Sequence, residues 1–72
     1  MKIFTAYVEW DPKTKLYVGI IPGVDGAHTQ GATLDELNTN LKEVLSLCLE
    51  ENSEANENIP QLVGLQQIEI EV

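Results

Sequence analysis

One stretch of this 72-residue chain, residues 34–50, has the apolar spacing of an amphipathic helix, and this feature limits the possible folds most. At about 100° per residue, its apolar side chains fall on one stripe roughly 100° wide, which predicts a helix with a single buried face. Thr33 and Glu36 form a capping-box pattern at its start, and Asp35 adds negative charge at the positive end of the helix dipole. The stripe consists of Leu34, Leu37, Leu41, Val44, Leu45 and Cys48, whereas Leu47 falls outside it.

The rest of the chain is typical of strands and of one polar loop. Residues 3–10 and 15–21 are rich in β-branched and aromatic side chains and are predicted to form a β-hairpin. Residues 27–31 could pair as a short third strand, and residues 66–72 alternate between apolar and acidic side chains as a final strand with one wet face. Between the helix and that strand, residues 51–61 are acidic and amide-rich, which indicates a solvated loop.

These elements predict a single α+β domain over residues 1–72. Its order is β-β-β-α-β, with a mostly antiparallel sheet and one helix on one face. The turn "DPKT" places an aspartate and a proline where a type I turn favours them. The hairpin register stays open, because pairing Trp10 with Lys15 puts Val8 beside Tyr17, whereas a slip of one residue puts it beside Val18.

Apolar side chains occur on both faces of the predicted hairpin, whichever register is chosen. Ile3 and Tyr7 point opposite to Val8 and Trp10, and the second strand is apolar on both sides as well. A single helix covers one face only, and a domain of this size buries only about 60% of its unfolded surface. We therefore predict a homodimer or homotetramer.

The charge balance bears on the kind of partner. Twelve acidic and four basic residues give a net charge of −8, which disfavours a surface that grips nucleic acid and favours a basic partner or simple solubility. The single Cys48 excludes an internal disulfide and is compatible with a reducing cytosol. Neither a signal-like N-terminus nor an apolar run long enough for a membrane helix is present, so the sequence predicts a cytoplasmic protein without membrane contact.

Catalytic patterns are weak throughout the chain. The stretch "PGVDGAHTQGATLDEL" has three glycines before the helix, but it matches no phosphate-binding motif and contains no lysine or arginine. His28 and Cys48 are far apart in the predicted fold, and one histidine with scattered acids is a poor metal set. Carboxylates that hold Mg²⁺ are the best remaining enzymatic alternative, although each acid has a turn, capping or solvation explanation. We predict no enzymatic activity, no metal and no cofactor.

The region from the second strand to the helix resembles the HicB family of toxin–antitoxin antitoxins. The family pattern resembles Y-x-A-x-x-P-x-L-P-G-C-x-T-x-G-x-T-x-E-E-A-x-x-N-x-x-E-A, and Asp35 replaces its first Glu conservatively. Three positions depart, since Gly19 stands for Ala, Asp25 for the second Pro and Ala27 for Cys. The positions that match are Tyr17, Pro22, Gly26, Thr29, Gly31, Thr33, Glu36, Asn40 and Glu43.

This resemblance implies a partial ribonuclease-H-like fold and an antitoxin that binds and blocks a HicA-like toxin, a small basic protein that cleaves mRNA. Many family members carry an additional DNA-binding domain. We expect none in residues 1–72, and therefore no direct nucleic-acid binding. The alternatives are an orphan interaction or scaffold domain of the same fold and a metal-dependent nuclease. Candidate contacts with the toxin are Tyr17, His28, Gln30, Asp35 and Leu47.

Overall fold

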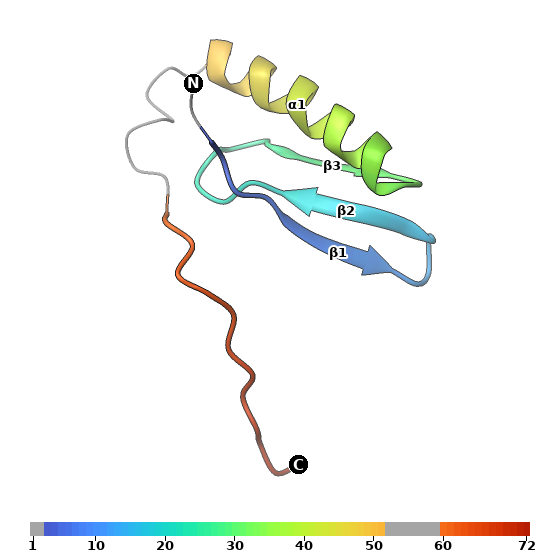
Figure 1. Cartoon of the computed structure of the whole chain (residues 1–72), viewed down its shortest axis with the longest axis vertical. Helices are drawn as coiled ribbons and strands as arrows, with labels where there is room; N and C mark the ends of the chain where they lie inside the picture. Colours follow the sequence, from blue (N-terminus) through green and yellow to red (C-terminus); the bar gives the residue numbers. More distant parts are fainter. Residues whose placement is uncertain (1–2, 52–59) are drawn as a thin grey trace.

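A computed structural model of the chain describes residues 3–51 and 60–72. It contains three strands and a helix in the order β-β-β-α, and the strands form one antiparallel sheet in the order β1-β2-β3. The helix lies on one face of this sheet (Figure 1), which confirms the predicted α+β class. The elements are β1 (Tyr7–Asp11), β2 (Leu16–Ile20), β3 (His28–Gly31) and α1 (Leu34–Glu51).

The register of the β1–β2 hairpin matches neither of the two expected pairings. Trp10 pairs with Tyr17 and Val8 with Gly19, because Asp11 ends β1 as a paired residue and leaves a four-residue loop before β2. Lys15 closes this loop in a left-handed conformation with φ of 59°, and its backbone N–H donates to the Asp11 carbonyl over 2.8 Å. A lysine in the sequence does not predict this left-handed conformation, which is usually adopted by glycine or asparagine.

The connection from β2 to β3 depends on glycines. Gly23 and Gly26 both have positive φ, at 85° and 82°, where a side chain would be strained. The backbone N–H of Ile21 donates to the Ala27 carbonyl over 2.8 Å and closes the loop. The strand β3 that follows lies within the predicted residues 27–31, so this expectation is confirmed.

The start of α1 is fixed by its own side chains. The Glu36 N–H donates to Thr33 Oγ1 over 3.1 Å, and Glu36 Oε2 accepts from the Ala32 N–H over 3.2 Å. The capping pattern read from the sequence therefore forms, with the return bond shifted to the residue before Thr33. The helix extends one residue beyond the predicted end, to Glu51.

The core lies between α1 and the strands β2 and β3. Its buried residues are Ile21, Val24, Ala27, Leu37 and Leu41. Within the described residues, α1 packs on β2 and β3 and not on β1. Leu34 was expected in the buried stripe, but it is 57% exposed because it stands at the very first position of the helix, next to the exposed cap. On the side of the sheet that faces the helix, the uncovered part is therefore the edge strand β1.

Two glycines bring the helix this close to the sheet. A Cβ atom built on Gly31 would lie 2.6 Å from the Leu37 backbone N, and one built on Gly19 would lie 3.0 Å from Leu41 Cδ1. Any larger residue at Gly31 would collide with helix backbone, which cannot turn away as a flexible side chain can. The direction of Gly19 also identifies the helix-covered face of β2, and alternation then assigns the faces of its neighbours.

The predicted final strand over residues 66–72 is not formed. The whole segment 60–72 is without regular secondary structure. Leu62 and Leu65 line a hollow along β1, and the end of the segment runs away from the sheet (Figure 1). Its alternation gave a strand's side-chain pattern but did not specify a pairing edge, and a strand requires a partner for its backbone groups. The predicted first strand is also shorter at its start, because pairing begins at Tyr7. Of the predicted loop 51–61, residues 52–59 lie outside the described part of the chain.

Candidate protein-binding surfaces

The five predicted contact residues do not form one site. His28 and Gln30 lie on β3 and pair with Ile20 and Val18, which places both on the sheet face opposite α1. Both side chains are exposed, so these two residues share a surface. The other three predicted contacts lie elsewhere, with Tyr17 on the helix-covered face of β2, Asp35 in the first turn of α1 and Leu47 in its second half.

Tyr17 has a structural partner within the chain. Its ring lies 4.8 Å from the ring of Trp10, centroid to centroid, with the two planes inclined at 59°. This tilted aromatic pair joins β1 to β2 and packs Tyr17 against the core. Trp10 remains 50% exposed. Tyr17 therefore lies between Trp10 and the core, and Trp10 is the more exposed of the two rings.

Leu47 stands on the outward side of α1 among carboxylates. It is 59% exposed, in agreement with its place outside the apolar stripe. Glu43 precedes it by four residues, and Glu50 and Glu51 follow by three and four, so on a helix all three are its surface neighbours. All three glutamates are exposed. We call Glu43, Leu47, Glu50 and Glu51 the acidic helix surface.

This surface combines an apolar contact point with a strong charge. Lys42 is the one basic residue in the sequence of α1, against Asp35, Glu36, Glu43, Glu50 and Glu51. A shallow hollow beside Leu47 is lined by Lys42, Glu43, Ser46 and Leu47. An exposed leucine surrounded by carboxylates fits a partner that presents an apolar side chain ringed by lysine or arginine.

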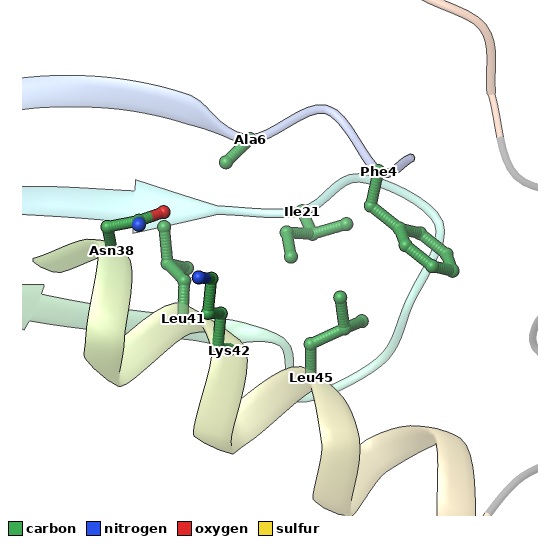
Figure 2. A pocket seen from close by; sticks show the side chains of 7 residues that line it. All are labelled: Phe4, Ala6, Ile21, Asn38, Leu41, Lys42 and Leu45. Carbon is green, nitrogen blue, oxygen red and sulfur yellow. The ribbon is translucent and has the colours of Figure 1, made fainter. Parts of the chain in front are cut away.

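The second candidate surface is the outer strand. Tyr7, Val8 and Trp10 are each exposed by between 43% and 50%, and we call these three residues the β1 edge. An adjoining hollow of about 240 Å³ lies between the segment that leads into β1 and the helix. Figure 2 shows the side chains that line it. A further hollow, of about 510 Å³, follows β1 itself. The first is lined by Phe4, Ala6, Ile21, Asn38, Leu41, Lys42 and Leu45, and the second by Thr5, Ala6, Tyr7, Val8, Glu9, Ile20, Leu62 and Leu65.

The β1 edge is the site that reasoning from the sequence missed. That reasoning recognised a surplus of apolar side chains in the hairpin but placed the candidate contacts on other residues. The missing information was the lateral position of α1, which covers β2 and β3 and leaves Val8 and Trp10 open. Trp10 could have indicated this site from the sequence, because it stands next to the hairpin turn and tryptophan is enriched at protein interfaces.

The titratable side chains in residues 3–51 and 60–72 do not gather into a cluster that could bind a metal. No group of three or more His, Cys, Asp or Glu side chains in these ranges could hold a metal ion. His28 is exposed on β3, whereas Cys48 is half-buried and packs against the core from α1. In the described ranges, no helix is both long and apolar enough to cross a membrane.

Comparison with known proteins relates the chain to three curated sequences that share one family name. It is 51% identical over 70 residues to a UPF0150 protein of Thermotoga maritima, a match that covers 97% of this chain and 92% of the relative. A UPF0150 protein of Synechocystis is 38% identical over 53 residues, or 74% of each chain. One from Archaeoglobus fulgidus is 35% identical over 54 residues, or 75% of each chain. No family model and no solved structure matches.

Proposed function

The chain belongs to the UPF0150 family, and we propose that it is a HicB-like antitoxin. In this proposal it binds a small basic HicA-like toxin and prevents the toxin from cleaving mRNA, entirely through protein–protein contact. The acidic helix surface carries the proposal, because Leu47 among three exposed glutamates is suited to a basic partner. The proposed location is the cytoplasm, where such a toxin would act.

The residues of the HicB-like pattern have structural roles that support the resemblance. Gly26 adopts a φ of 82°, and Gly31 allows the backbone of Leu37 to approach β3. Thr33 caps the helix, and the Asn40 side chain donates from Nδ2 to the Gln30 carbonyl over 2.8 Å. These positions fix the arrangement of loop, strand and helix, so a family that shares them would share this scaffold.

The partial ribonuclease-H-like fold of that family is part of the proposal. The β-β-β-α order accounts for the first four elements of such a domain. Addition of residues 66–72 to the sheet as a further strand would supply the fifth. The hypothesis is thus compatible with the unpaired segment of Figure 1, provided that a pairing partner reaches it.

Inhibition would proceed by masking. The net charge of −8 attracts a basic protein over distances up to about a Debye length, roughly 8–10 Å at physiological salt. Contact with the glutamates around Leu47 would then occupy the lysines and arginines with which the toxin grips RNA. Charge of this kind acts mainly on the association rate, whereas the buried apolar contact at Leu47 governs dissociation.

The same charge distribution argues against direct repression through operator DNA. The chain has four lysines and no arginine, and binding to a phosphate backbone requires several cations on one surface. Lys13 and Lys15 lie at the hairpin tip, whereas Lys42 lies on the acidic helix. We propose that the purified chain neither binds nucleic acid specifically nor cleaves it with Mg²⁺ or Mn²⁺.

A binding-rate measurement with a HicA-like toxin tests this proposal. The association rate should fall at least about tenfold between low and high salt, because the attraction is screened. Glu50→Lys with Glu51→Lys should lower the rate at low salt, and Leu47→Asp should raise the dissociation rate. Asp25→Asn, an exposed acid on the β2–β3 loop, serves as the control and should change little.

Two results would count against the proposal. If the toxin binds with the same rate at both salt concentrations and to the lysine variant, the acidic helix surface is not the contact. If the purified chain cleaves RNA with Mg²⁺ and loses this activity when Glu9 and Asp11 become Gln and Asn, the metal-dependent nuclease is the better account.

A further inference from the structure

An unpaired strand-like segment and an unpaired strand edge occur in the same chain. Ile68, Ile70 and Val72 alternate with Glu69 and Glu71, and all five side chains are exposed. We propose that residues 68–72 of one copy pair with the outer edge of β1 in a second copy. Residues 68–72 of the second copy pair in turn with β1 of the first. This inference goes beyond the proposed function and does not depend on it.

The donor segment, residues 68–72, has an apolar side that is exposed to solvent in a single copy. Ile68 and Ile70 are 75% and 70% exposed, and Val72 is fully exposed. The segment runs away from the sheet, as Figure 1 shows. An extended segment with one apolar and one acidic side has the composition of a half-buried strand. Pairing with a sheet edge would bury its apolar side chains and give hydrogen-bond partners to its backbone groups.

The acceptor is the backbone of β1 on the side away from β2, which we call its outer edge. β1 pairs only with β2 among the described strands, so its other side presents free backbone groups. On the helix-covered side of the sheet, Val8 and Trp10 stay half-exposed because α1 does not reach them. On the opposite side, β1 carries Tyr7, Glu9 and Asp11. Over residues 8–11 the strand therefore has the same division into an apolar and an acidic side as the donor, and Tyr7 at its start is the exception.

The two patterns match in one orientation. If Ile68, Ile70 and Val72 lie beside the apolar side of β1, they cover Val8 and Trp10. Glu69 and Glu71 then face water on the side of Glu9 and Asp11. The donor has five alternating residues, and β1 is five residues long. The reverse orientation would set glutamates against Trp10 and place the isoleucines beside Glu9 and Asp11, with Tyr7 as their apolar neighbour on that side of β1.

A second copy is a better acceptor than the chain's own β1. Leu62 and Leu65 already line the hollow along Thr5–Glu9, so the chain reaches its own β1 before the alternating segment begins. At a strand rise of about 3.3 Å per residue, residues 68–72 continue past most of the five-residue strand. Each copy has one donor and one acceptor, so a two-fold exchange uses both and closes the assembly.

The exchange places four carboxylates close together on one side of each added strand pair. Their mutual repulsion opposes pairing and is screened by salt. The dimer should therefore become tighter as salt rises, opposite to the salt dependence proposed for binding of a basic toxin. This difference separates the two contacts experimentally.

Sedimentation equilibrium of the full chain tests the exchange. The wild type should have twice the 8.0 kDa mass of one chain at high micromolar concentration. The dissociation constant of this dimer should be lower at high salt. Ile70→Asp should weaken the dimer at least about 100-fold, because each two-fold dimer loses two buried aliphatic side chains and places a charge at both positions. Glu71→Gln, its neighbour on the wet side, is the matched control and should leave the dimer as tight or tighter.

A mixing experiment distinguishes exchange from other dimers. Val8→Asp alters the acceptor and Ile70→Asp the donor, so each variant alone should be monomeric. Their equimolar mixture contains one intact donor with one intact acceptor and should regain dimers. A monomeric wild type, a dimer unaffected by Ile70→Asp, or a mixture without recovery despite helical circular dichroism of both variants would each overturn the proposal.

Discussion

Replacement of Gly31 by alanine tests the account of how α1 is held against the sheet. The added Cβ would lie 2.6 Å from the Leu37 N, 3.0 Å from the Leu37 Cα and 3.1 Å from the Glu36 carbonyl carbon. All three atoms belong to the helix backbone, so relief requires the first turn of α1 to move away from β3. Leu37 is 1% exposed and would lose packing in that movement.

The expected cost follows from these contacts. Overpacking typically costs 1–3 kcal/mol, and disturbance of the Thr33 cap adds about 1 kcal/mol, so we expect a loss of about 2–4 kcal/mol. The total free energy of unfolding for a chain of this length is roughly 4–11 kcal/mol. The φ of Gly31 is not positive, unlike that of Gly23 and Gly26, so the effect measures close approach and not backbone strain.

Urea unfolding followed by circular dichroism and by Trp10 fluorescence gives the measurement, at one protein concentration so that self-association contributes equally. Gly64→Ala is the matched control, because a Cβ at Gly64 meets nothing within 4 Å. Its free energy of unfolding should stay within about 0.5 kcal/mol of the wild type. If Gly31→Ala is equally neutral, the helix does not depend on this approach and the reasoning is wrong.

Three further substitutions test separate parts of the scaffold. Thr33→Ala removes the oxygen that accepts from the Glu36 N–H and should cost about 1 kcal/mol in urea unfolding, whereas Thr33→Ser should cost little. Gly26→Ala should cost about 1–2 kcal/mol through its φ of 82° alone, because the new Cβ meets Cys48 Sγ at an ordinary 3.5 Å; Gly26→Asn should cost less. Asn40→Ala leaves the Gln30 carbonyl without its side-chain donor and should lower stability by about 1 kcal/mol; a neutral result would show that water replaces it.

The parts of the fold that sequence reasoning predicted are those with local causes. The helix over residues 34–50 follows from the Thr33 cap and the spacing of its leucines, and both work within one or two turns. Leu47 was predicted to stand outside the buried stripe for the same reason, and its exposure confirms this. Such features need no knowledge of the rest of the molecule.

The parts that were wrong depend on choices between distant elements. The hairpin register turned on Lys15 entering the left-handed region, for which its side chain gives no signal. The lateral position of α1 depends on the close approach at Gly19 and Gly31, and it determines that Val8 is left open. Alternation in residues 66–72 indicated a strand but could not name the edge that would receive it.

The central proposal is that this chain neutralises a basic ribonuclease by covering it. Its most direct test is RNA cleavage by a HicA-like toxin, followed while the purified chain is titrated in. The account predicts that cleavage stops at a fixed stoichiometric ratio and that Leu47→Asp requires a much larger excess of the chain. Full cleavage at every ratio, with both proteins folded, would contradict it.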